Sequence, residues 1–122
     1  MATKKPRYPT SIPFHYMGFD WEIKFLDSYR EDTYGVTSTD SKYIHIYYGK
    51  REDQDIMETL LHELSHAMML DLADSIFHFE KVETDEKEEN LIRLTSPRIF
   101  SIIRDNPKLV DFIVKRIKEL DK

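Results

Sequence analysis

The chain has 122 residues, with 18 Lys and Arg against 23 Asp and Glu, five His and no Cys. This length suits one domain, because domains commonly run to about 100–150 residues. The formal net charge of −5 argues against a general affinity for nucleic acid or acidic membranes, since both attract basic surfaces. The lack of Cys excludes disulfides, thiolate-ligated metals and a thiol nucleophile. Any metal must therefore be held by nitrogen and oxygen ligands.

The start of the chain carries Lys4, Lys5 and Arg7, but no apolar segment typical of a secretory signal follows. No stretch approaches the roughly 18–20 apolar residues of a membrane span. Proline recurs through the first dozen residues, which predicts a flexible arm over residues 1–13. We expect a soluble cytoplasmic protein with a single domain over residues 1–122.

The first half of the chain has the patterns of a small sheet. Residues 21–25 alternate apolar and charged side chains, which predicts a strand with one buried face. Residues 34–37 and 43–48 are rich in β-branched and aromatic side chains and flank a polar loop, which indicates a hairpin. We therefore expect about three strands in an antiparallel sheet.

After Gly49 the apolar period changes to that of helices. A first helix should begin near Asp53 or Asp55, either of which can cap it, and end near Leu72. A second helical stripe follows the acidic run at residues 80–89, and Pro97 should kink or break it. The Asp-Asn-Pro sequence at 105–107 ends that element, and an amphipathic helix over residues 109–120 follows. A sheet followed by helices predicts an α+β fold.

His62-Glu63-Leu64-Ser65-His66 is an HExxH motif inside the first predicted helix. Residues four apart lie about one turn apart on one helix face, so both imidazoles can reach one Zn²⁺. Glu63 points about 100° round the helix and can address a metal-activated water without binding the metal. This arrangement predicts a zinc site in which Glu63 is the catalytic general base that takes a proton as water attacks a polarised carbonyl.

A catalytic zinc usually has three protein ligands and one open position, so a third ligand is needed. With about 100° per helical residue, Glu88 points in the direction of the apolar stripe that begins at Leu91. Glu89 lies about 100° further round, and Glu86 points nearly opposite to Glu88. Glu88 is thus the acid expected to face inward and to complete a His62, His66 and Glu88 metal site.

A Tyr-Gly strand, a hairpin, the HExxH helix and a later helix bearing a Glu together resemble a minimal zincin core. Over residues 34–107 the chain is similar to small gluzincin-like metallopeptidases of phages and mobile elements, akin to the ImmA/IrrE group. In that group the third ligand is a Glu in a pattern like E-x-x-A-N-x-F-A. Placed on Glu88, the pattern has Ile92 where Asn belongs. Placed on Glu86, it recovers Asn90 but puts Glu89 at a small-residue position, so Glu86 stays open as the ligand.

The resemblance implies a zinc-dependent peptidase with a protein or peptide substrate, such as a regulatory protein. It also implies that the hairpin's edge strand binds the substrate by β-addition, here through residues 43–48. Neither nucleic acid nor a membrane is an expected partner. Two alternatives stay open: a non-catalytic zincin-fold protein in regulation or phage morphogenesis, and a hydrolase of a non-peptide amide.

Four further side chains are weaker candidates for a functional role. His45 is predicted to lie on the strand face away from its Ile neighbours, at the surface or in a cleft. His78, between two Phe in the segment after the first helix, could act as an electrophile. Tyr34 or Tyr47 could donate a hydrogen bond to an oxyanion.

Overall fold

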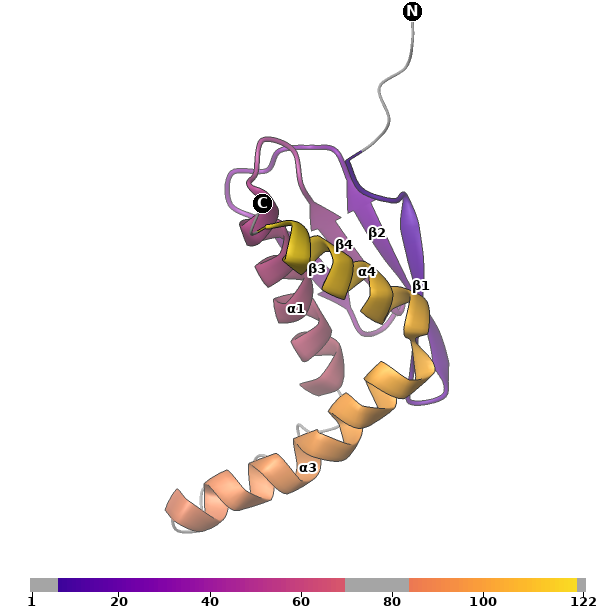
Figure 1. Ribbon diagram of the computed structural model, residues 1–122. Coiled ribbons are helices and arrows are strands. Elements are labelled where there is room, and N and C mark those ends of the chain that lie inside the picture. The colour runs from indigo at the N-terminus through magenta and orange to yellow at the C-terminus, as the bar shows by residue number, and fades with distance from the viewer. Residues whose placement is uncertain (1–6, 70–83, 121–122) are drawn as a thin grey trace, which may run out of the picture.

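The computed structural model describes residues 7–69 and 84–120. In chain order the elements are β1 (Ser11–Tyr16), β2 (Phe19–Leu26), β3 (Gly35–Ser38), β4 (Tyr43–Tyr47), α1 (Asp53–Met69), α3 (Thr84–Asp105) and α4 (Pro107–Glu119). The predicted α+β layout is confirmed, because a sheet comes first and helices follow (Figure 1). Figure 1 shows α1 and α4 over the same face of that sheet.

The sheet has the strand order β1-β2-β4-β3. The hairpin of β3 and β4 is confirmed as an antiparallel pair, but β2 and β4 run parallel, so the prediction of an antiparallel sheet is wrong at this pair. The register explains the arrangement, since Ile23 lies beside Ile44 and Phe25 beside Ile46. All four side chains are buried, so this pairing directs the apolar residues of both strands to one face.

Strand β1 is the element that the sequence analysis missed. Residues 7–13 do not form the expected flexible arm: β1 begins at Ser11, and Tyr8 is only 2% exposed. Proline is tolerated there because β1 is an edge strand of the sheet, where a missing N–H donor costs little. Residues 1–6 of the predicted arm lie outside the described residues. The sheet therefore has four strands rather than three.

Helix α1 is amphipathic and packs against the sheet through its mainly apolar face. Its buried residues are Ile56, Met57, Thr59, Leu60, Glu63, Leu64 and Ala67. It begins at Asp53, one of the two predicted starting points, while the expected end near Leu72 lies outside the described residues. Helix α3 runs through Pro97, which is exposed, so the predicted alternative of a break at this residue is wrong.

Asn106 joins the helices to the sheet at the junction between α3 and α4. Its side-chain Oδ1 accepts the backbone N–H of His15 at 2.7 Å, and its Nδ2 donates to the His15 carbonyl at 3.0 Å. The same Nδ2 also donates to the Ile102 carbonyl at 2.9 Å. Asn106 is 3% exposed, so its amide pairs with β1 backbone groups away from water and fixes the point where α4 turns back over the sheet.

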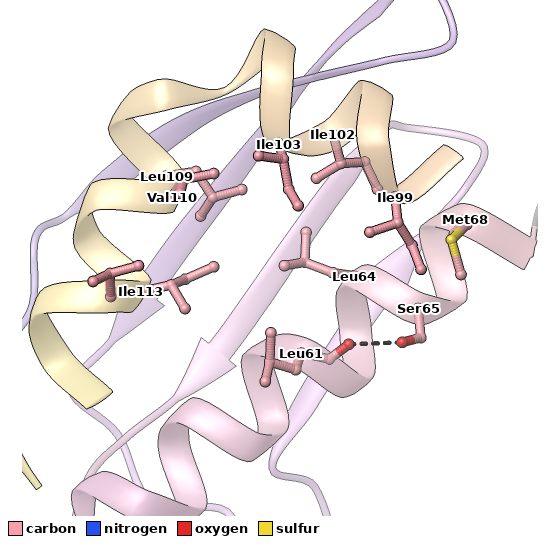
Figure 2. Close-up of a pocket in the computed structure, with 11 residues that line it drawn as sticks. Leu61, Leu64, Ser65, Met68, Ile99, Ile102, Ile103, Leu109, Val110 and Ile113 are labelled. Carbon is pink, nitrogen blue, oxygen red and sulfur yellow. Dashed lines mark hydrogen bonds between the residues drawn. The ribbon is translucent and has the colours of Figure 1, made fainter. Parts of the chain in front are cut away.

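The apolar interior opens to the surface between α1, α3 and α4. A hollow of about 360 Å³ lies there. Figure 2 shows its lining side chains, which come from all three helices and include Leu61, Leu64, Ile99, Ile103 and Val110. This face of α1 is therefore apolar and distinct from the face that carries the two motif histidines. Among the residues that the structure describes, no helix combines the length and apolar character needed to cross a membrane.

Candidate metal centre

His62, Glu63 and His66 form a compact group on α1. The Nε2 atoms of the two histidines lie 3.1 Å apart, and their rings meet edge to face with centroids 4.7 Å apart. One potential ligand atom from each of the three residues lies within 4.8 Å of the others. The helical spacing of the motif therefore brings the two imidazoles and the carboxylate together, as predicted.

The donor set fits a zinc ion. Two imidazole nitrogens bound to one tetrahedral zinc at about 2.0–2.1 Å are separated by about 3.4 Å. The 3.1 Å between the Nε2 atoms of His62 and His66 is close to that separation. The side chain of His62 is 67% exposed, so a metal and a substrate could reach this face from solvent. Imidazole and carboxylate donors, without Cys, are a ligand set that zinc accepts.

Glu63 differs from its histidine neighbours because its side chain is buried, at 8% exposed. Its Oε1 accepts a hydrogen bond from the hydroxyl of Thr37 at 2.7 Å. Its other oxygen, Oε2, lies 3.8 Å from Nε2 of His62. One carboxylate oxygen is therefore held by strand β3, and the other lies near the imidazoles.

Gly35 allows β3 to come this close to α1. A Cβ built at Gly35 would lie 2.9 Å from Cγ2 of Thr59, 3.0 Å from Cγ of Glu63 and 3.1 Å from the backbone oxygen of His45. Real Cβ atoms almost never make contacts under 3.0 Å, so a side chain here would force Thr59 and its neighbours to shift. Close packing of β3 against α1 therefore explains why residue 35, which precedes the motif in the chain, is a glycine.

Two open hollows meet at the group, and both are lined by Gly35, His62 and Glu63. One, of about 480 Å³, is also lined by Asp32, Thr33, Tyr34, Glu58 and Thr59. The other, of about 410 Å³, is also lined by Val36, Thr37, Thr39 and His66. Together they follow β3 past the two histidines. The group therefore lies along a groove beside a strand rather than in a closed cavity.

The strand at this groove is β3, which corrects the expectation for residues 43–48. Strand β4 lies between β2 and β3 and has neighbours on both sides, so it cannot accept an added strand. Within residues 7–69 and 84–120, strand β3 pairs only with β4 and forms an edge of the sheet beside α1. The sequence identified the hairpin but could not show which of its two strands β2 would pair with.

Of the weaker candidates, one Tyr lies at the groove, whereas His45 lies on the other face of the sheet. His45 pairs with Val36, on the sheet face opposite to Gly35 and α1, and its ring stacks on Tyr43 at 4.2 Å. Burial lowers the pKa of His45, with a smaller contribution from the charge of Lys24. Tyr34 lines the larger hollow, whereas Tyr47 is buried. His78 lies outside the described residues.

Glu88 is not brought together with the histidines. It lies near the start of α3 with an exposed side chain, and the described metal-binding group holds only the three residues of α1. The stripe that was to turn Glu88 inward is also not buried, since Leu91 is 40% exposed and Ile92 49% exposed. Glu89 lies 3.8 Å from Arg93, and the side chain of Glu86 lies outside what the structure describes. The third ligand stays a prediction.

Sequence reasoning missed the part of the site that comes from β3. Gly35 carried a usable signal, because a glycine inside a strand often marks a close backbone approach. Thr37 carried none, since one Thr before a polar turn is an ordinary surface residue in a sequence. Comparison of the chain with protein-family models, curated proteins and solved structures gives no match.

Proposed function

We propose that this chain is a zinc-dependent peptidase of the small gluzincin-like type, in which His62 and His66 bind zinc and Glu63 is the general base. The observation that carries the proposal is the geometry of these side chains: two Nε2 atoms 3.1 Å apart and a buried carboxylate oxygen 3.8 Å from one of them. Glu88 is the proposed third ligand, with Glu86 and Glu89 as alternatives. A protein or peptide is the proposed substrate, and the cytoplasm the proposed compartment.

A zinc ion held by these residues would supply a Lewis acid beside the carboxylate. Glu63 would take a proton from the attacking water at Oε2, because Oε1 already accepts a hydrogen bond from Thr37. It would then return that proton to the nitrogen of the leaving amine. A buried carboxylate next to two exposed imidazoles is suited to this role, since its environment is dry while the substrate side stays open.

The groove along β3 supports a peptide as the substrate. An extended chain that pairs with the free edge of β3 would run past His62, His66 and Glu63. Backbone hydrogen bonds would hold such a chain irrespective of its sequence, and the flanking hollows would receive alternate side chains. Asp32 and Glu58 line only one of these hollows, so the two ends of the groove differ in charge.

The first experiment measures zinc content and peptide cleavage together. We expect the purified chain to hold about one zinc ion and to cleave members of a peptide library, and Glu63→Gln to retain zinc while losing at least about 100-fold in rate. His62→Ala should lose both zinc and activity. A chain that binds no zinc, or a Glu63→Gln variant that cleaves as well as the wild type, would contradict the proposal.

A non-catalytic zincin-fold binding protein is the second candidate. It is favoured by one observation: among the described residues, the possible metal ligands beside the two histidines come from α1 alone, where Glu63 is the proposed base, and no carboxylate of another element joins them. Such a protein would show no cleavage that depends on Glu63. Cleavage of small amides but not of peptides would instead point to a hydrolase of a non-peptide substrate.

A further inference from the structure

We propose that Thr37 is a positioning residue for Glu63: its hydroxyl holds one carboxylate oxygen so that the other remains free as the base. This inference rests on the proposed function, in which Glu63 moves the proton. It adds a residue from β3 to a site whose other members all come from α1.

The hydrogen bond itself is the first argument. Oγ1 of Thr37 lies 2.7 Å from Oε1 of Glu63 and 3.1 Å from the backbone oxygen of Glu63. A hydroxyl has one proton to donate, and the shorter contact, to the carboxylate, is the stronger because its acceptor is charged. Both acceptors belong to Glu63, so the hydroxyl is directed at this residue of α1 whichever of the two oxygens shares its proton.

Burial makes this hydrogen bond effective. The Glu63 side chain is 8% exposed, so water competes little for Oε1. Within the described parts of the chain, Thr37 is the only residue that donates a hydrogen bond to this side chain. A Glu side chain has several rotatable bonds, and one strong contact at its end selects among the conformers that they allow. In this conformer Oε2 of Glu63 points toward His62 and lies 3.8 Å from its Nε2.

The strand explains why residue 37 is the one that reaches Glu63. Alternate residues of a strand face the same side, and Gly35 approaches Glu63 on the α1 side. Thr37 is the next residue on that side. Because Gly35 has no side chain, the strand lies close enough for the short Thr37 side chain to reach the carboxylate. A β-branched hydroxyl residue also fits the strand itself.

Kinetics with two substitutions test the positioning role. Thr37→Val keeps the shape of the side chain and removes the hydroxyl, whereas Thr37→Ser keeps the hydroxyl. We expect Thr37→Val to lower kcat by about tenfold to 100-fold, the effect of losing one hydrogen bond to a charged group, with KM and zinc affinity nearly unchanged. Thr37→Ser should retain most of the wild-type kcat. Equal losses in both variants, or an unchanged kcat in Thr37→Val, would overturn the inference.

A double-mutant cycle on the zinc-free chain gives a readout that needs no activity. Denaturant unfolding is measured for the wild type, Thr37→Val, Glu63→Ala and the double variant. We expect Thr37→Val to shift the unfolding equilibrium by about tenfold when Glu63 is present, and by much less when it is absent. An additive cycle would show that the hydroxyl and the carboxylate do not interact, which contradicts the inference.

The two experiments separate failure of this inference from failure of the proposed function. Wild-type protein without Glu63-dependent cleavage contradicts the proposed function and removes any role of Thr37 in the reaction, whatever the cycle shows. Active wild-type protein with an additive cycle contradicts only the inference about Thr37. Coupling in the cycle together with a kcat loss that Thr37→Ser avoids supports both.

Discussion

The carboxylate of Asp53 joins the start of α1 to the amino-terminal segment, because both Tyr8 and Arg7 donate hydrogen bonds to it. The Tyr8 ring packs against Phe25 and Tyr48, with centroids 5.3 and 5.0 Å away, and its hydroxyl donates to the carboxylate of Asp53. Arg7 donates to the same carboxylate at 2.7 Å. These hydrogen bonds, that of Tyr8 first, hold the pKa of Asp53 below its ordinary value, since they favour the ionised form.

This lowered pKa makes part of the stability depend on pH. An Asp in the unfolded chain takes up a proton near pH 3.9, about the usual value, whereas Asp53 in the folded chain does so at lower pH. The contribution of Asp53 to the free energy of unfolding is therefore complete above about pH 4, and it is lost as the pH falls through the pKa of Asp53 in the folded chain.

We predict that Asp53→Asn lowers the free energy of unfolding at neutral pH by about 1 kcal/mol or less, because the carboxylate is half exposed. The difference from the wild type should shrink at low pH. Urea unfolding between about pH 2.5 and 7 measures it, with Asp111→Asn, an exposed position on α4, as the control. A difference that stays constant with pH would show that Asp53 acts through packing alone.

At the scale of elements, the close approach of β3 to α1 builds the site. Gly35 permits that approach, because the atoms of Thr59, Glu63 and His45 occupy the space that a Cβ would need. The two atoms of α1 belong to side chains, and the third atom belongs to the backbone of β4. A Cβ at residue 35 must therefore shift Thr59, Glu63 and the backbone of β4, and the shift of Glu63 disturbs the site.

Gly35→Ala should therefore cost about 1–3 kcal/mol in stability, as overpacking does, and lower the rate of peptide cleavage. Gly18→Ala is a matched control, because nothing lies within 4 Å of its Cβ and its φ of +77° makes the cost conformational. We expect the control to lose comparable stability while keeping the wild-type rate. Thermal unfolding and kinetics on both variants give the comparison, and equal rate losses would refute a specific effect at the site.

At the scale of the whole molecule, the relation of α3 to α1 decides whether the metal site is complete. Helix α3 is tied to β1 near its end, through the carbonyl of Ile102 and the amide of Asn106. Its earlier turns have Leu91 and Ile92 exposed, and in Figure 1 the first half of α3 extends away from the sheet. A ligand from the start of α3 would have to come from this projecting half.

Excess zinc should raise Tm, because a ligand that binds only the folded chain stabilises it by about 2.7 kcal/mol at 100 times its Kd. At roughly 4 °C per kcal/mol, the shift is about 10 °C, and a chelator should reverse it. The shift should disappear in His66→Ala. It should be reduced more in Glu88→Gln than in Glu86→Gln or Glu89→Gln. Equal effects of the three Glu substitutions would refute Glu88 as the ligand.

Much of this architecture follows from local patterns. The alternation at residues 21–25 predicted β2, the runs on either side of the polar loop predicted the β3–β4 hairpin, and the Asp-Asn-Pro sequence predicted the junction at Asn106. The HExxH spacing placed His62, Glu63 and His66 together because one turn of one helix is enough to do so. None of these predictions needs contacts between distant parts of the chain.

The remaining features depend on such contacts. The pairing of β2 with β4 made β3 the free edge, and the core took in Tyr8 from a segment whose prolines suggested an arm. Neither the hydrogen bond from Thr37 to Glu63 nor the exposure of Leu91 can be read from periodicity. Thus the sequence by itself determined the α+β layout and the three motif residues, since short-range geometry sets both. Only the tertiary structure decided which strand borders them and which hydroxyl holds Glu63, because residues far apart in the chain make those contacts.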